Sequence, residues 1–496
     1  MKQLEFVRTG EPWIDNGIMA LWQIFRANPD VSPRLRDKQV QRETRKKDPA
    51  DKVTAVLSPD SLILKGSPVR IRALLDDCIE NLSVRTWQHT RTGKMWWSGV
   101  ASFFFKQQIG GPKMLLKSPD ALERKGSRGA CDFCGRTDLK VTEARTSEHP
   151  FLVKSDKMSS FYSQFRGSIH ICSSCTFASW FTTPRVLFNI DWKENTLNAF
   201  FFDATDLLRR FRIERWFGQC YASDKPYANF KAALRHVKHP LENLVGFLLA
   251  IYDKRTQIGE NDLQGVTAHV FSVRLDGQKV SFTRYYTVPN LPQILSFLAL
   301  MKWQSVIGKS HNALEDVMRN FFFHHGGKVD TVMREELAHR FLTSSEIADV
   351  IEEFLFRRIL SEKGNLSDFE VISYYKLTSI YEGEVLELDS HILNAARNLG
   401  NILGAVAAER DDKSILYSLR GLRNLEDYYA YLHQFVTRHT DSLQKGNVRP
   451  TIDTITSEID EGNWRNHKSI VGIYSVLKYV DVLNQMRRSR KPAEVT

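Results

Sequence analysis

Two pairs of cysteines carry the clearest chemistry in this sequence. Cys131 and Cys134 form one CxxC pair, and Cys172 and Cys175 form a second, in a chain that has six cysteines. Zinc prefers tetrahedral thiolate sulfur, and two CxxC turns supply four such ligands. Four sulfurs leave no coordination position open for a substrate. The pairs therefore predict one structural zinc ion per chain.

The spacing of the pairs predicts how zinc would act on the fold. The 37 residues between the pairs form a long excursion, which the ion would hold at its base. Gly129 and Gly135 flank the first pair, where the backbone has to bend to point its amides at the sulfurs. We therefore expect a zinc-binding insertion over residues 129–176.

His149 offers an alternative, because it lies between the two pairs in the tripeptide Glu148-His149-Pro150. In HNH nucleases stapled by zinc, a general-base histidine occupies such a position. Those enzymes also need a downstream Asn or His to complete a catalytic metal site. The segment after Cys175 offers neither until Asn189. We interpret His149 as a loop histidine that packs or hydrogen-bonds, and an HNH-like nuclease is the alternative.

Other catalytic signatures fail on their spacing. Gly308-Lys309-Ser310 resembles the end of a phosphate loop, but Trp303 stands where the first glycine must be. The sequence has no GxSxG nucleophile elbow and no glycine-rich dinucleotide fingerprint. We therefore expect a protein that is not an enzyme.

The positive charge of the chain is concentrated in its front part. The net charge is +11, with +10 from residues 31–130 and −4 from residues 341–496. Such asymmetry points to a polyanionic partner, although a solvated basic surface without a ligand would look the same.

Several cations in this basic region are mixed with aromatic residues, which suits phosphate contact combined with base stacking. We assign the aromatic residues Trp96, Trp97 and 103–105 to the core. The side chains that we predict to contact nucleic acid are Arg42, Arg45, Lys46, Lys47, Arg91, Lys94, Gln107, Gln108, Lys113, Arg124, Lys125 and Arg128.

The elements that would position these residues can be read from hydrophobic periodicity. Residues 8–27 predict a turn and a helix, which Asp15 could cap. Residues 53–57 and 62–64 predict short strands. Alternating residues on both sides of Asp276-Gly277 predict a β-hairpin.

The pattern turns helical from about residue 331. Residues 391–409 follow Ser390, a possible cap, and apolar residues near 470–480 keep helical spacing. We predict a bundle of about four to six helices. The fold class is therefore α+β. Residues 1–330 would form a mixed nucleic-acid-binding region with the zinc-pinned insertion, and residues 331–496 the helical bundle.

The sequence also predicts where the protein works. No apolar run reaches the roughly 18 residues that span a bilayer, and the N-terminus lacks a secretory signal. We expect a cytoplasmic protein with no membrane partner.

Together, these motifs resemble a known family. The segment RTGEPWIDNGIMAL, the CDFC and CSSC pairs, the EHPF segment between them and the helical C-terminus are similar to the CXXC-CXXC family. These proteins are large subunits of type I-B CRISPR Cascade surveillance complexes, which serve antiviral defence.

The resemblance implies a function and partners. Such a subunit is not catalytic; it recognises the motif that flanks a target in double-stranded DNA (the PAM), helps to unwind the duplex and recruits a helicase-nuclease. Guide RNA supplies most of the sequence specificity in RNA-guided systems. The implied partners are guide RNA, target DNA, the other subunits of the ribonucleoprotein complex and the helicase-nuclease. The C-terminal bundle would resemble the small subunit. A zinc-stabilised scaffold without nucleic-acid contact is the remaining alternative.

Overall fold

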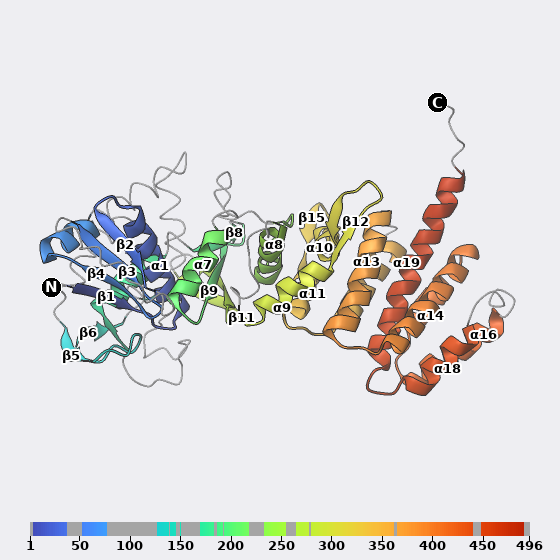
Figure 1. Ribbon diagram of the computed structural model, residues 1–496. Helices are drawn as coiled ribbons and strands as arrows, with labels where there is room; N and C mark the ends of the chain where they lie inside the picture. The colour runs from blue at the N-terminus through green and yellow to red at the C-terminus, as the bar shows by residue number, and fades with distance from the viewer. Residues whose placement is uncertain are drawn as a thin grey trace, which may run out of the picture. The chain divides into compact units, whose positions relative to one another are not determined.

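The protein divides into two compact units in a computed structural model, whose elements are labelled in Figure 1. One unit comprises Met1–Lys231 and Asp253–Pro292, and the other comprises Ala232–Tyr252 and Gln293–Thr496. The second unit thus begins before the predicted boundary at residues 330 and 331. The structure describes residues 3–36, 52–76, 126–144 without 138, 149, 169–182, 186–217 without 192, 233–253, 264–361 without 277 and 278, 365–439 and 448–490.

The described residues form both helices and strands, and helices dominate the C-terminal region. This confirms the predicted α+β class. The first unit contains a four-stranded sheet of order β1-β4-β3-β2, in which β2 and β3 run parallel. The predicted strands at 53–57 and 62–64 correspond to β3 and β4. The strands are β1 (Gln3–Val7), β2 (Val31–Leu35), β3 (Val53–Leu57) and β4 (Ser61–Lys65).

The predicted N-terminal helix is α1 (Pro12–Ala27), which buries most of its first three turns. Pro12 suits the first helical position, where no backbone hydrogen bond is lost. The prediction that Asp15 caps this helix is wrong. Glu11 is the N-cap, and its Oε2 accepts a hydrogen bond from the Ile14 amide at 2.8 Å. Asp15 lies in the first turn instead, where its carboxylate faces the preceding loop.

A second four-stranded sheet of the first unit has the order β11-β10-β9-β8. The predicted hairpin is confirmed as the antiparallel pair β10 and β11, with Asp276 opposite Lys279. A bulge interrupts the pairing between Ser272 and Val273. The elements here are β8 (Leu187–Asp191), β9 (Thr196–Asp203), α7 (Leu207–Phe217), β10 (Thr267–Asp276) and β11 (Lys279–Val288).

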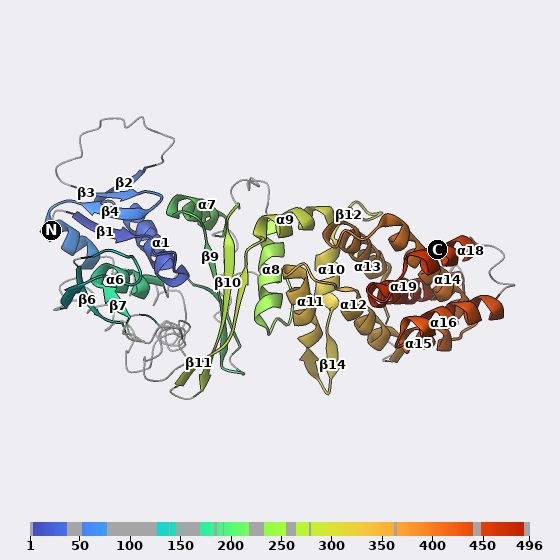
Figure 2. The ribbon, with the colours of Figure 1, turned by 90° about the horizontal axis from the view of Figure 1, so that it is seen from below.

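A small three-stranded sheet, β5-β6-β7, carries the cysteine pairs at its ends. Both neighbouring pairs of strands are antiparallel, and Val141 of the central strand lies opposite Cys172. Figure 2 shows α6 beside these strands. The bounds are β5 (Ser127–Gly129), β6 (Leu139–Glu143), β7 (His170–Cys172) and α6 (Ser173–Thr182).

The second unit is mainly helical and includes two short hairpins. Its long helices α14 and α19 pack closely, since a Cβ at Gly404 would lie 2.2 Å from the Ser475 carbonyl oxygen. The elements before residue 331 are α8 (Pro240–Asp253), α9 (Leu291–Leu300), β12 (Lys302–Gln304), β13 (Ser310–Asn312), α10 (Ala313–Asn320), β14 (Phe323–His325) and β15 (Lys328–Asp330).

Eight α-helices follow residue 331 in the described part of the chain, more than the four to six predicted. The predicted helix at 391–409 corresponds to α14. Asp389, and not Ser390, caps α14, through its carboxylate and the His391 amide. The helices are α11 (Val332–Leu342), α12 (Ala348–Leu355), α13 (Asp368–Ile380), α14 (Ser390–Glu409), α15 (Ser414–Arg420), α16 (Leu425–Arg438), α18 (Val448–Glu458) and α19 (Trp464–Arg490), with π-helical turns at Phe356–Ser361 and Tyr381–Val385.

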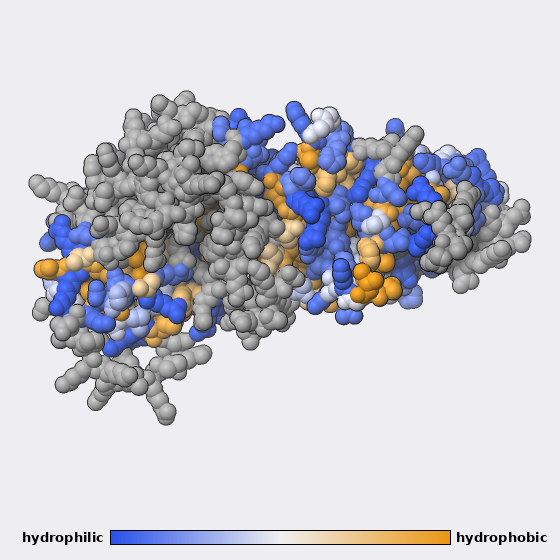
Figure 3. All heavy atoms as spheres, turned by 90° about the horizontal axis from the view of Figure 1, so that it is seen from above, coloured by the Kyte–Doolittle hydropathy of each residue, from blue (hydrophilic) through white to orange (hydrophobic). Residues whose placement is uncertain are grey.

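The surface of the second unit carries a few large apolar side chains. Between β12 and β13, Val306 is fully exposed and Ile307 is mostly exposed. On α13, Phe369 and Ile372 are exposed. In Figure 3, a compact orange group stands out on the blue surface of this unit. None of the described helices is both long enough and apolar enough to cross a membrane.

Candidate metal centre

The four cysteines of the two CxxC pairs meet at one end of the small sheet. Cys131 and Cys134 lie in the turn between β5 and β6, Cys172 ends β7, and Cys175 lies in the first turn of α6. Their sulfur atoms all lie within 4.8 Å of one another. Cys131, Cys172 and Cys175 are buried, and Cys134 is partly exposed. Of the predicted site residues, these four are brought together as the sequence indicated.

The sulfur separations fit a tetrahedral metal ion. The Cys131 and Cys175 sulfurs are 3.9 Å apart, and so are those of Cys134 and Cys172. A disulfide would require about 2.05 Å, so the cysteines are thiols. Four sulfurs at about 2.3 Å from a central ion lie about 3.8 Å from one another. The cluster could therefore hold one metal ion, and tetrahedral sulfur suits zinc or iron.

Backbone geometry around the first pair prepares the sulfurs for an ion. Gly135 has a φ of +68°, a conformation that glycine adopts without strain, and its amide donates to the Cys131 carbonyl at 2.9 Å. The Cys172 amide lies 3.4 Å from the Cys131 sulfur and donates to it. The Cys172 amide stabilises thiolate charge on Cys131, as the outer shell of a metal site does.

The thiols affect one another's ionisation because four sulfurs crowd into one place. A hydrogen bond with Cys134 raises the pKa of Cys131, but bonds with Cys172 and Cys175 lower it, and the result is about 7. Bonds with the other three thiols and burial hold the pKa of Cys175 well above its usual range. Four like charges cannot collect here without a cation, and a bound metal ion would deprotonate all four thiols.

Arg136 brings positive charge to the same place. Its Nη1 lies 3.3 Å from Glu5 Oε2 on β1. Burial lowers the pKa of Arg136, but Cys134 and Cys172 outweigh that effect and raise it. The guanidinium therefore offsets part of the negative charge of a four-thiolate site and ties it to the first sheet.

The second cysteine pair leads directly into the helix that packs on α1. Trp13 Nε1 of α1 donates to the Ser179 carbonyl of α6 at 3.0 Å, and the Thr182 hydroxyl donates to the Trp13 carbonyl at 2.6 Å. A Cβ at Gly17 would lie 1.8 Å from the Ala178 carbonyl oxygen, so only glycine fits there. Holding Cys172 and Cys175 in place therefore fixes the start of the helix on which α1 rests.

His149 forms a second link between the cysteines and α1. Its ring stacks on Phe133, between the first two cysteines, with centroids 5.1 Å apart. Its Nε2 lies 3.2 Å from Glu11 Oε2, the N-cap of α1. Burial raises the pKa of Glu11, but His149 and the first amides of α1 outweigh burial, so the pKa lies below its usual value. His149 is completely buried and packs, as the sequence interpretation expected.

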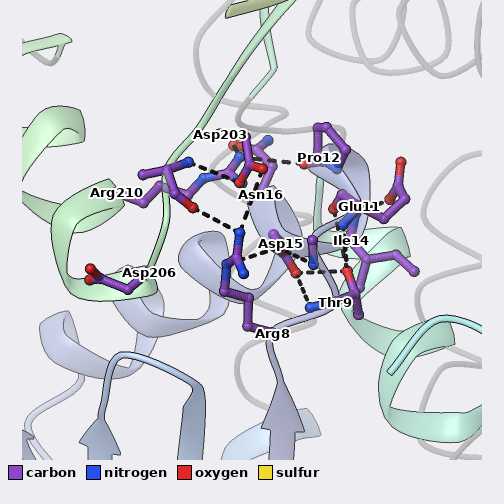
Figure 4. Close-up of polar contacts among 12 residues, drawn as sticks. Arg8, Thr9, Glu11, Pro12, Ile14, Asp15, Asn16, Asp203, Asp206 and Arg210 are labelled. Atoms are coloured by element: carbon purple, nitrogen blue, oxygen red, sulfur yellow. Dashed lines mark hydrogen bonds and ion pairs between the residues drawn. The ribbon is translucent and has the colours of Figure 1, made fainter. Parts of the chain in front are cut away.

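The segment Thr9–Asn16 builds a charged network on the other side of α1 (Figure 4). Asp15 accepts hydrogen bonds from the amides of Thr9 and Gly10 at 2.8 and 2.9 Å. Burial raises the pKa of Asp15 to about 6, although the charge of Arg210 and the bonds from Thr9 lower it. Arg210 also lies 3.7 Å from Asp203 and donates to the Asn16 side chain. The network anchors the start of α1 to α7 and β9.

The sequence prediction missed these roles of Glu11 and Asp15. A carboxylate between Ile14 and Ile18, on the apolar side of a helix, was a signal that Asp15 is buried. No local signal indicated that Glu11 meets a histidine 138 positions away, because that contact depends on the whole fold.

The structure describes one of the residues predicted to contact nucleic acid. Arg128 is exposed on β5, opposite Lys140 and three residues before Cys131. The other eleven lie outside the described residues, and their placement stays a prediction: Arg42, Arg45, Lys46, Lys47, Arg91, Lys94, Gln107, Gln108, Lys113, Arg124 and Lys125.

No protein-family model and no curated protein matches this chain. Its function therefore has to be inferred from its own residues and from the motif resemblance.

Proposed function

We propose that this chain is the non-catalytic large subunit of an RNA-guided CRISPR surveillance complex and that it binds DNA. The observation that carries the proposal is the meeting of two motifs. The RTGEPWID segment and the CxxC pairs, which together define the family resemblance, pack against each other through His149 and through α6. Both motifs therefore belong to one core, as a single site that combines them requires.

We further propose that the metal is zinc, one ion per chain, with a structural role. Zinc accepts four thiolates in tetrahedral geometry and has no redox chemistry of its own. The four cysteines would hold it, and the ion would supply the positive charge that allows all four to be thiolates. The site would then stabilise the docking of α6 on α1.

The proposed partners follow from charge and from the resemblance. Residues 31–130 carry +10, and the exposed Arg128 places one of those charges close to the metal centre. We infer contact with the phosphates of target double-stranded DNA, next to guide RNA and other subunits of the complex. The resemblance adds recognition of a flanking motif, help in unwinding and recruitment of a helicase-nuclease.

The placement of His149 favours this proposal over an HNH-like nuclease. A general base has to reach the proton that it removes, whereas His149 is buried and its Nε2 faces Glu11. Purified protein should leave plasmid DNA intact in the presence of Mg²⁺ or Mn²⁺. Cleavage that disappears in His149→Ala would instead support the nuclease.

Salt-dependent DNA binding tests the proposal. Replacing Arg45, Lys46 and Lys47 with Glu should weaken duplex binding for every sequence, and each lost phosphate contact should flatten the slope of log K against log salt by about 0.9. The matched control reverses three exposed arginines of the helical unit, Arg423, Arg438 and Arg465. Parent protein that shows no salt-sensitive binding to DNA would support the scaffold alternative.

A further inference from the structure

The hairpin of β14 and β15 has a tip that is basic and exposed. Its sequence is His324-His325-Gly326-Gly327-Lys328, and all five residues are exposed. Gly326 and Gly327 have φ values of +54° and +77°, as a tight two-residue turn requires. A Cβ on either glycine would meet nothing within 4 Å, so the glycines serve the turn and the tip stands in open space. In Figure 2 the hairpin projects past α10 and α11.

The base of the hairpin is fixed by an aromatic and a guanidinium. Phe323 is buried and packs on Phe354, with centroids 4.9 Å apart. The Arg357 guanidinium lies over the Phe323 ring, 4.1 Å from its centroid, and hydrogen-bonds to His325 Nε2. A guanidinium only donates, so His325 Nε2 accepts in this bond, which leaves Nδ1 to face a ligand. The hairpin therefore presents a fixed donor beside a fixed cation.

A second segment, residues 235–238, adds cationic side chains to the same surface. Lys238 Nζ donates to the Val329 carbonyl of β15. The ring of Phe322 lies between two histidines, 5.5 Å from His236 and 5.3 Å from His324. Arg235, His236 and Lys238 are exposed.

A buried ion pair holds this segment in an unusual conformation. His236 has a φ of +55°, a left-handed conformation that is uncommon in residues other than glycine. Arg334 supports it by donating to the carbonyls of Arg235 and His236 at 2.8 and 3.1 Å. Arg334 is itself paired with Glu242 at 2.5 Å, and both side chains are fully buried. Strained residues that a buried network holds in place are typical of functional surfaces.

The charge balance of this surface selects an anionic ligand. Arg235, Lys238 and Lys328 are positively charged and exposed, and Arg357 lies beside the tip. Asp330 at the base accepts a hydrogen bond from the Val332 amide, which directs its Oδ1 away from the tip. Cations and imidazole donors on a rigid support, with a glycine turn that allows close approach, suit phosphate oxygens.

We propose that this surface, made of residues 235–238 and the β14–β15 hairpin, binds the phosphate backbone of DNA. The inference rests on the proposed function, and it adds a second DNA contact in the helical unit, separate from the basic region at 31–130. Binding by such side chains is independent of base sequence and depends on salt.

The test compares two lysines that both lie exposed in short hairpins of this unit. Lys328→Glu changes the proposed surface, and Lys309→Glu, between β12 and β13, is the matched control. Binding of a fluorescein-labelled 30-base-pair duplex is measured by anisotropy over a range of salt concentrations. The loss of one phosphate contact should weaken binding about eightfold near 0.1 M salt and flatten the salt slope by about 0.9. Lys309→Glu should change affinity less than twofold.

Equal effects of the two substitutions, or no effect of Lys328→Glu, would overturn this proposal while the parent still binds DNA. A parent that binds no DNA would refute the proposed function, and this inference with it. If Lys328→Glu loses the parent's binding to phosphatidylglycerol vesicles but binds DNA as the parent does, the proposal is overturned and the surface binds lipid headgroups instead. Circular dichroism checks folding, and Lys328→Gln replaces Lys328→Glu if the charge reversal unfolds the protein.

Discussion

The substitution Gly17→Ala tests whether α1 and α6 meet as closely as the structure shows. Helix propensity alone predicts stabilisation, because alanine inside a helix is favoured over glycine by about 1 kcal/mol. The structure predicts the opposite sign. The added Cβ would lie 1.8 Å from the Ala178 carbonyl oxygen, 2.5 Å from its carbon and 2.8 Å from the Thr182 hydroxyl.

The cost can be worked out from these distances. Ordinary contact begins at 3.4 Å, so the helices would have to separate by about 1.6 Å, more than the gap that forfeits about half of the dispersion energy between facing atoms. Overpacking of a well-packed core costs about 1–3 kcal/mol, and occasionally more. The 1.8 Å contact is with backbone atoms, which puts the cost at the upper end of that range, about 3 kcal/mol. After subtraction of the helix-propensity gain of about 1 kcal/mol, we expect a net loss of about 2 kcal/mol. For a unit of this size, that lowers the melting temperature by about 4–8 °C.

Differential scanning fluorimetry and urea unfolding would measure the effect. Gly66→Ala is the matched control in the same unit, because its nearest neighbour, Val53 Cγ2, is 3.4 Å away. The control should change the free energy of unfolding by less than about 0.5 kcal/mol. A Gly17→Ala protein as stable as the parent, or more stable, would refute the close approach of the two helices.

Three further predictions follow from the metal centre and the buried histidines. Cys131→Ser or Cys172→Ser should abolish metal retention and lower the melting temperature, which metal analysis and thermal unfolding would show; retention of a full equivalent would contradict the site. His149→Ala should leave DNA binding intact but lower stability by about 1–3 kcal/mol, because Glu11 loses a buried partner. Burial lowers the pKa of His467 to about 3, against about 6.5 in an unfolded chain, so the unfolded state takes up the proton as the pH falls below 6.5 and stability is lost. The free energy of unfolding falls by about 1.36 kcal/mol per pH unit below pH 6.5. Between pH 7 and pH 5, the free energy of unfolding of His467→Gln, measured with urea, should therefore fall by about 2 kcal/mol less than that of the parent. Equal decreases would contradict the lowered pKa of His467.

Local patterns predicted the local parts of this fold. The CxxC spacing predicted the meeting of four sulfurs, because each pair is a short turn that delivers two ligands. The Asp276-Gly277 dipeptide between alternating residues predicted the hairpin of β10 and β11. Each CxxC turn and the hairpin turn depend on residues close together in the chain, whereas the meeting of the two pairs spans 37 residues.

Contacts between distant segments were beyond such patterns. Glu11 and Asp15 are both plausible caps of the same helix, and only the fold shows that Glu11 caps it while Asp15 enters a network with Arg210. The net charges of residues 31–130 and 341–496 did not reveal the basic surface. Residues 235–238 and 324–328 lie outside both ranges and meet only in three dimensions.

The four cysteines, which could hold one metal ion, are proposed to bind structural zinc. The most direct test is the metal content of freshly purified, reduced parent protein, measured by inductively coupled plasma mass spectrometry with protein quantified by amino-acid analysis. We expect one zinc ion per chain. Protein that is folded but contains no zinc, or that contains iron in its place, would contradict the proposal.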